Sequence, residues 1–267
     1  MIRDLAAQPV YPLLDPDVCA RQGRGPHEVL GAWSDLKLRV FQLRAKDRGP
    51  DEYTALAREF RAEFPDLRIL ANDHAEVALE RQDLFAGLHV GQEDWGQLPE
   101  GVRSRIRKTG RENLARPASE IFEIGLSTHD ASQLEQALSA WTGLAPQTEH
   151  PLWSYVATGP MWGTSSKTSG LSPLISERKR RDLFQKFVRV RAEIERRHPT
   201  APAAWPFLVA IGGITDQNVG DLLADWPRMS SVPPLRPAVI QAALDFEQLT
   251  FLIKKVALQE SDKTLET

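Results

Sequence analysis

The chain has 267 residues, 42% of them hydrophobic and 26% charged, which is enough for one barrel-sized domain or two ordinary ones. Its formal net charge of -3 gives no broad attraction to nucleic acid, and its apolar runs fall far short of the ~20 residues that cross a bilayer. The N-terminal segment lacks the apolar core of a secretory signal, and Cys19 is the only cysteine, so we expect a soluble, cytoplasmic protein without an intrachain disulfide.

Short apolar runs that end in polar residues predict eight β-strands, several of them followed by helical periodicity. In chain order the predicted strands are 10–14, 39–43, 67–71, 88–90, 122–126, 155–158, 207–211 and 238–240. Apolar spacing predicts helices after the second and third strands and at the end of the chain, where the apolar positions are Phe246, Leu249, Phe251 and Leu252. Strands that alternate with helices pair in parallel, and eight of them in about 250 residues fit a closed barrel. We therefore predict an α/β fold, a single-domain (β/α)8 TIM barrel over residues 1–267.

The connection between the sixth and seventh predicted strands, about 168–206, is long for one crossover. Apolar residues at helical spacing predict a helix within it, namely Leu183, Phe184, Phe187, Val188 and Ile194. The basic run 178–181 could contact nucleic acid or an anionic surface. A solvated helix face is the favoured interpretation, because Glu193 and Glu195 soon interrupt the positive charge.

Polar residues follow the predicted strands at the end where parallel barrels carry their chemistry. Gln42, Arg44 and Lys46 alternate, so a continuing strand would turn all three to one side as an anion clamp. Asp73 follows the third strand, and Asp94 follows the fourth, one helix and one strand later. The two acids are therefore predicted to face each other at neighbouring strand ends.

The remaining strand ends are also polar. Ser127 follows the fifth run, the loop 159–167 follows the sixth, and Gly212-Gly213 follows the seventh. Paired glycines before a predicted helix N-terminus can cradle a phosphate with backbone N–H groups. Each motif alone also fits a polar turn or tight packing, and His89 on an apolar strand fits a satisfied core histidine. Their common location at one end of successive strands favours a phosphate-binding site.

Together, the segments QLRAK, ND, HVGQED, GLSTH, GPMWGTSSK and VAIGGIT resemble the thiamine-phosphate synthase family, in the family's order and over about 11–214. The resemblance implies a TIM barrel and a transferase reaction. In that reaction, 4-amino-2-methyl-5-pyrimidinylmethyl diphosphate joins 4-methyl-5-(2-phosphooxyethyl)thiazole to give thiamine phosphate and diphosphate with the help of Mg2+. The implied partners are thus phosphorylated small molecules, with no nucleic acid and no membrane.

The resemblance also implies roles for matching residues. Those that would hold the pyrimidine diphosphate are Gln42, Arg44, Lys46, Asn72, Ser127 and Lys167, of which Arg44, Lys46, Ser127 and Lys167 would stabilise the leaving group. Asp73 and Asp94 match the magnesium ligands. The positions that match the thiazole-phosphate site are Thr164, Ser166, Gly213, Ile240 and Gln241.

The eighth strand, near 238–241, departs from the family because Gln241 stands where a serine-containing turn is usual. Two alternatives therefore stay open, a thiazole tautomerase-like enzyme and a non-catalytic barrel that binds a phosphate ligand. Retention of Arg44, Lys46, Asp73, Asp94 and Lys167 argues against the tautomerase, which lacks the full diphosphate and metal set.

Overall fold

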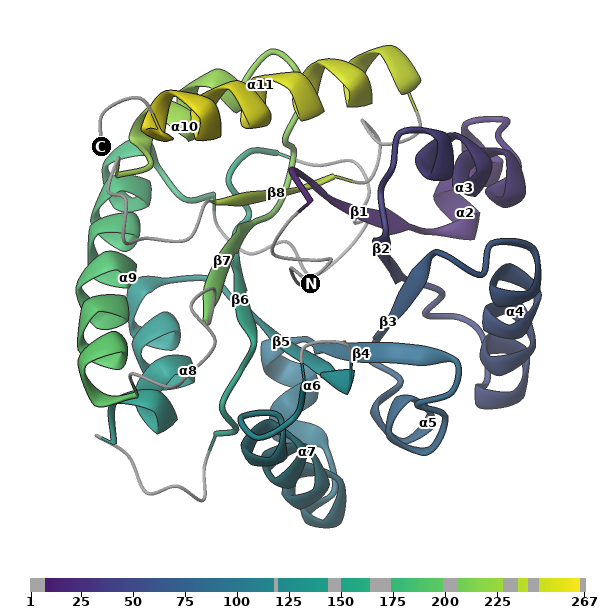
Figure 1. The fold of residues 1–267 in the computed structure, drawn as a ribbon, viewed down its shortest axis with the longest axis horizontal. Coiled ribbons are helices and arrows are strands. Elements are labelled where there is room, and N and C mark those ends of the chain that lie inside the picture. The colour runs from purple at the N-terminus through teal and green to yellow at the C-terminus, as the bar shows by residue number, and fades with distance from the viewer. Residues whose placement is uncertain are drawn as a thin grey trace.

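Eight parallel strands close into a barrel in the order of the sequence, with β8 beside β1 (Figure 1). The structure is a computed structural model that describes residues 8–117, 120–143, 150–163, 174–198, 206–227, 235–239 and 245–264. The strands are β1 (Tyr11–Leu14), β2 (Val40–Leu43), β3 (Arg68–Asn72), β4 (Phe85–Val90), β5 (Glu123–Thr128), β6 (Tyr155–Thr158), β7 (Phe207–Ala210) and β8 (Arg236–Val239).

Helices surround the barrel on its outside (Figure 1). They are α2 (Pro16–Arg21), α3 (Pro26–Asp35), α4 (Pro50–Glu63), α5 (Ala75–Glu80), α6 (Gln92–Gln97), α7 (Glu100–Glu112), α8 (Ala131–Thr142), α9 (Glu177–Arg197), α10 (Val219–Asp225) and α11 (Phe246–Thr264). In the part of the chain that the structure describes, no helix is both long enough and apolar enough to span a membrane.

The prediction of a single-domain TIM barrel is confirmed, although several strand bounds differ. β4 begins at Phe85 rather than at residue 88, because Gly87 lies inside the strand and pairs with Glu123 of β5. A Cβ on Gly87 would lie 2.3 Å from the Glu123 carbonyl oxygen, so a glycine that resembles a boundary is a close-packing site. β8 begins at Arg236, which is buried although its charge resembles that of a loop residue.

The helix predicted in the long sixth connection is confirmed as α9, whose predicted apolar positions are buried or packed against the core. The basic run in it is only partly solvated, which corrects the prediction of a solvated face. Arg180 is 5% exposed and pairs with Asp225. In α11, Leu249 and Leu252 are buried, but Phe251 is 42% exposed and was wrongly placed on the apolar face.

Tyr53 of α4 joins the carboxyl ends of two strands. Its hydroxyl donates to the Leu43 carbonyl oxygen at 2.7 Å and accepts from the Asn72 backbone N–H at 3.1 Å. The ends of β2 and β3 are therefore fixed relative to each other. The residues that follow these strands, Arg44 and Asp73 among them, start from a defined position.

Candidate active site

Asp73 lies at the meeting point of three strand ends. Its backbone has a φ of 61°, in the left-handed region that Asp and Asn tolerate better than most residues. One carboxylate oxygen accepts from the Gly91 backbone N–H at 3.0 Å. The other accepts from the Asn72 side-chain amide and lies 2.9 Å from Lys46 Nζ. The carboxylate is thus held by residues that follow β2, β3 and β4.

Asp94, in the first turn of α6, converges on the same place. A Cβ built on Gly91 would lie 2.3 Å from Asp94 Oδ2 and 3.8 Å from Asp73 Oδ1, so both carboxylates lie close to this glycine. Burial and then the negative charge of Asp73 raise the pKa of Asp94. Burial alone would raise the pKa of Asp73 as well, but Lys46 outweighs it and holds that pKa below its ordinary value. The two acids face each other, as the sequence predicted.

These opposite pKa shifts predict opposite effects of substitution on the metal-free protein. Folding raises the pKa of Asp94. Asp94 therefore adds to the free energy of unfolding at low pH, and this contribution is lost as the pH rises through the pKa of the folded state. Asp94→Asn should therefore leave the free energy of unfolding at neutral pH unchanged or raise it. Because folding lowers the pKa of Asp73, its contribution is present at neutral pH and is lost on acidification. Asp73→Asn should lower the free energy of unfolding at neutral pH.

Urea denaturation of both variants in a chelator, at neutral pH and near the ordinary Asp pKa, measures this difference. The deficit of Asp73→Asn should shrink as the pH falls. A larger loss for Asp94→Asn than for Asp73→Asn at neutral pH would contradict this electrostatic description of the pair.

Arg44 is held from the side of β1. Its guanidinium is ion-paired with Oδ2 of Asp15, an acid only 3% exposed, and its backbone N–H donates to the Leu14 carbonyl oxygen at 2.8 Å. The other oxygen of Asp15 caps α2 by accepting from the backbone N–H groups of Asp17 and Val18. Asp15 is not among the predicted site residues, although it follows β1 as Asp73 follows β3.

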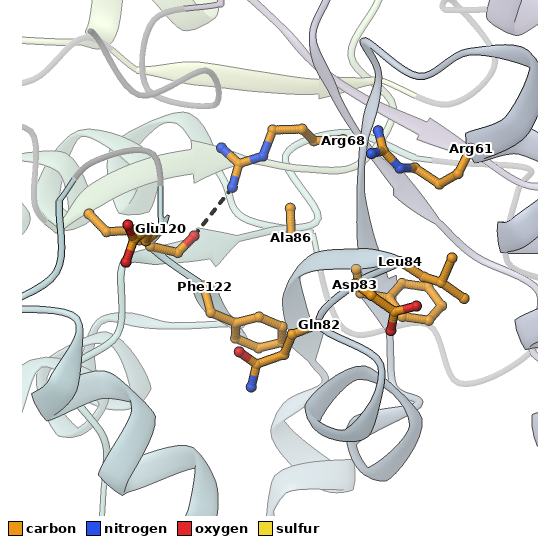
Figure 2. A pocket seen from close by; sticks show the side chains of 10 residues that line it. Arg61, Arg68, Gln82, Asp83, Leu84, Ala86, Glu120 and Phe122 are labelled. Atoms are coloured by element: carbon orange, nitrogen blue, oxygen red, sulfur yellow. Dashed lines mark hydrogen bonds between the residues drawn. The ribbon is translucent and has the colours of Figure 1, made fainter.

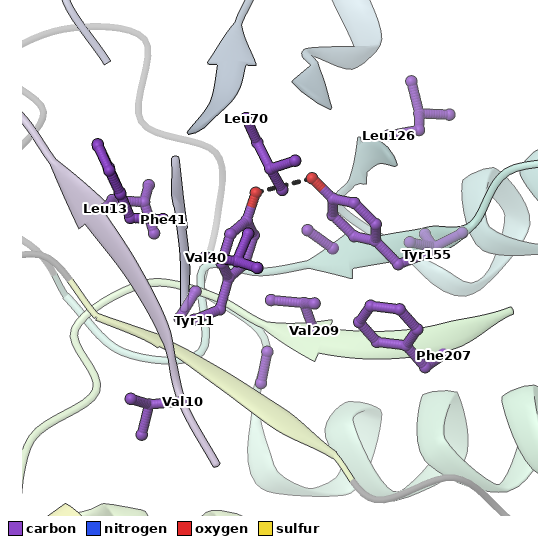
Figure 3. Packing of buried hydrophobic residues seen from close by; sticks show 14 of the residues in the cluster. Val10, Tyr11, Leu13, Val40, Phe41, Leu70, Leu126, Tyr155, Phe207 and Val209 are labelled. Carbon is purple, nitrogen blue, oxygen red and sulfur yellow. Dashed lines mark hydrogen bonds between the residues drawn. The ribbon is translucent and has the colours of Figure 1, made fainter. Parts of the chain in front are cut away.

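Gln42 faces the barrel interior and begins a polar network there. Its amide donates to the Tyr11 hydroxyl at 2.9 Å. The Tyr11 hydroxyl in turn lies 2.7 Å from the Tyr155 hydroxyl (Figure 3). His89 lies 3.1 Å from that hydroxyl through Nδ1 and 2.8 Å from Ser127 Oγ through Nε2. The two tyrosines were missed, because in the sequence they are indistinguishable from the apolar residues of their strands.

The prediction of an anion clamp formed by one continuing strand is wrong. β2 ends at Leu43, so no continuing strand aligns the three polar residues that were predicted to share one side. Gln42 points into the barrel, Arg44 toward β1, and Lys46 toward Asp73. All three still lie at the carboxyl end of β2.

Tyr155→Phe is expected to lower the free energy of unfolding by about 1–3 kcal/mol, because it removes the hydroxyl that hydrogen-bonds with both Tyr11 and His89 inside the barrel. The ring and its stacking on Phe207 would remain. The double variant Tyr11→Phe/Tyr155→Phe should cost less than the sum of the single changes, since it removes both hydroxyls of one contact. Denaturant titration of the four proteins in this cycle measures the coupling, and strict additivity would show that the contact contributes nothing.

The segment after β6 runs along the end of β7. The backbone N–H groups of Met161 and Trp162 donate to the carbonyl oxygens of Ile211 and Gly212 at 2.9 and 3.1 Å. Gly213 has a φ of 60°, and a Cβ on it would lie 2.2 Å from the Gly163 carbonyl oxygen. The glycine pair thus permits close contact between the two segments.

One feature of the predicted phosphate cradle is wrong. A turn over 216–218 separates the glycine pair from α10, so no helix begins directly after it. Asn218 closes this turn by donating to the Gly213 carbonyl oxygen at 2.8 Å and accepting from the Thr215 backbone N–H at 2.9 Å. The other residues predicted for the thiazole-phosphate side, and one predicted for the diphosphate, lie outside the described residues: Thr164, Ser166, Lys167, Ile240 and Gln241.

A surface cavity of about 210 Å3 lies at the opposite end of the barrel, near the amino ends of β3, β4 and β5 (Figure 2). Its two arginines are engaged by the backbone. Arg61 donates to the Pro65 and Leu67 carbonyl oxygens, and Arg68 donates to that of Ile121 at 3.2 Å. Side chains at this end of a TIM barrel serve stability rather than chemistry. The candidate active site is therefore at the carboxyl end.

Comparison with known proteins identifies the family of the chain. A family model described as thiamine monophosphate synthase matches residues 10–226, which is most of the chain. The chain belongs to the thiamine monophosphate synthase family. Relatives called thiamine-phosphate synthase include one from Rhizobium etli, 32% identical over 185 residues, which cover 68% of this chain and 69% of the relative. Another, from Methanoregula boonei, is 31% identical over 233 residues, which cover 84% of this chain and 85% of the relative.

A solved structure of a thiamine phosphate pyrophosphorylase from Pyrococcus furiosus has the same fold. It superposes with a TM-score of 0.56 at 18% identity and covers 94% of this chain and 98% of that one. At this identity the likeness supports the barrel alone. Membership of the thiamine monophosphate synthase family rests on the family model and the sequence relatives.

Proposed function

We propose that this protein is a thiamine-phosphate synthase that condenses the pyrimidine diphosphate with the thiazole phosphate and releases diphosphate. The observation that carries the proposal is that Asp73 and Asp94 meet beside Lys46, with Arg44 at the end of the neighbouring strand β2, in a member of this family. Two acids beside a cation, with a second cation on the next strand, suit a diphosphate bound together with a hard divalent metal. A cytoplasmic location belongs to the same proposal.

The donor set fits magnesium. Asp73 and Asp94 bring two carboxylates to one place, and these would be ligands of the metal. Mg2+ is bound in this way in phosphate-transfer sites, through one or two carboxylates, water and substrate phosphates. When bound, it would neutralise the negative charge that grows on the leaving diphosphate.

The chain's own residues have separate tasks in this proposal. Arg44, oriented by Asp15, and Lys46, which lies on Asp73, would bind diphosphate oxygens and stabilise them as the bond breaks. Ser127, whose hydroxyl lies against His89, would stand beside the leaving group. Lys167 is assigned to the same group. The aminopyrimidine can delocalise the positive charge that remains, so the thiazole nitrogen can add without a protein nucleophile.

Turnover of the two substrates with Mg2+, followed by the appearance of thiamine phosphate and diphosphate, tests the proposal. Each substrate is omitted in turn as a control. A tautomerase-like enzyme would isomerise a thiazole precursor without releasing diphosphate. A non-catalytic barrel would bind phosphorylated ligands without turnover, and either result would replace the proposed function.

A further inference from the structure

Trp162 connects the glycine pair after β7 with the helix in the long sixth connection. Its backbone N–H donates to the Gly212 carbonyl oxygen, and its Cβ would lie 2.9 Å from a Cβ built on Gly213. On its other side, the guanidinium carbon of Arg180 in α9 lies 4.8 Å from the centre of the Trp162 ring system. The backbone of Trp162 therefore lies against the glycine pair, while its ring lies against α9.

Arg180 is itself fixed by a second partner. Its Nε donates to Oδ2 of Asp225 at 2.7 Å, and Asp225 is the last residue of α10, the helix that follows the glycine pair. The two side chains are 6% and 5% exposed, so one desolvated guanidinium contacts both the segment before β7 and the helix after it. Arg181 also pairs with Asp225, through Nε at 2.6 Å, but its side chain is 56% exposed and it has no described contact with Trp162.

A buried arginine is a costly way to fill space, because its charge must be desolvated and paired. Its planar guanidinium can stack on an aromatic ring while its edge binds a carboxylate, which a lysine or an apolar residue cannot reproduce. The geometry therefore favours a role in fixing the direction of Trp162 over simple packing.

We propose that Arg180 is a positioning residue that acts through Trp162 to hold the segment 159–163 against Gly212-Gly213, and thereby sets the affinity for the thiazole phosphate. This inference rests on the proposed function and on the family resemblance that assigns that phosphate to Gly213. Most groups assigned to the pyrimidine diphosphate stand at the ends of β2, β3, β4 and β5, and Lys167 alone follows the segment 159–163. Loss of Arg180 should thus act chiefly on the thiazole phosphate.

Calorimetric dissociation constants for each substrate, together with both Michaelis constants, test the inference. Arg180→Gln should weaken thiazole-phosphate binding about tenfold, the effect of losing one desolvated cation–π contact, and leave pyrimidine diphosphate binding unchanged. Arg180→Lys should recover part of the loss. Trp162→Leu should reproduce it, and the Arg180→Gln/Trp162→Leu double variant should be no worse than either single change.

Two matched controls separate positioning from stability. Arg181→Gln removes the exposed partner of Asp225 and should leave both dissociation constants unchanged. Arg180→Gln/Asp225→Asn removes both members of the buried pair, which limits unfolding from an unpaired charge, and should retain the selective loss.

Binding is measured whether or not turnover occurs, so the two proposals can fail separately. A wild-type protein that binds both substrates without turnover contradicts the proposed function. The effect of Arg180→Gln on the two dissociation constants still decides the role of Arg180. Equal weakening of both substrates, no weakening, or a wild-type protein that does not bind the thiazole phosphate overturns the inference.

Discussion

Asp73→Asn and Asp94→Asn are each expected to lower kcat by more than roughly a hundredfold. Loss of a residue that only orients a metal ligand costs up to about a hundredfold, and loss of a direct ligand should cost more. Each change removes one of two carboxylates from the proposed magnesium site and keeps the side chain's size. Asn also tolerates the left-handed backbone at position 73. Kinetic titration with Mg2+ should show a weakened dependence on the metal as well as lower turnover.

Asp66→Asn is the matched control for these variants. Asp66 precedes β3 at the opposite end of the barrel, and its side chain is 81% exposed. The substitution Asp66→Asn removes the same charge at a distance from the proposed magnesium site. The variant should therefore keep the wild-type kcat and the wild-type dependence on Mg2+. Full wild-type turnover in a chelator would refute the metal role of both acids.

Arg44→Ala is expected to cost about 2–4 kcal/mol of transition-state stabilisation, by analogy with loss of one preorganised donor to a developing oxyanion. The loss should appear mainly in kcat, because the charge on the leaving diphosphate grows as the bond breaks. Steady-state kinetics at saturating substrate measure it. A variant with full turnover and only a raised Michaelis constant would make Arg44 a uniform binder instead.

The same substitution should destabilise the fold, because it leaves the buried Asp15 without its ion partner. Arg44→Ala/Asp15→Asn removes that isolated charge, and should recover stability without recovering turnover. This double variant distinguishes a catalytic loss from partial unfolding. Arg39→Ala, at the other end of the second strand, is a surface control that should change neither quantity.

Much of the barrel could be predicted because its strands are short apolar runs of the kind that parallel sheets bury on both faces. The predicted strand bounds were wrong where contacts with other parts of the chain, not the local sequence, decide the conformation of a residue. Gly87 resembles a turn residue but lies in β4, where the Glu123 carbonyl leaves no space for a side chain. Arg236 resembles a loop residue but begins β8, in a buried position.

The site divides in the same way. The convergence of Asp73 and Asp94 could be predicted, because the carboxyl ends of neighbouring parallel strands meet at one rim. The contacts of Tyr53 and Tyr155 could not, since Tyr53 reaches β2 and β3 from a helix and Tyr155 reaches Tyr11 across the barrel. Asp15 follows β1 and was open to the same reasoning as Asp73. The magnesium and substrate roles remain predictions.

The contact between Tyr11 and Tyr155 joins two residues 144 positions apart in the chain. A half-barrel that ended before β6 would lack the Tyr155 hydroxyl, which hydrogen-bonds with both Tyr11 and His89 in the closed barrel. The interior of this barrel is therefore unsuited to division into two self-sufficient halves, and its hydrogen bonding is completed only when the first and sixth strands belong to one closed ring.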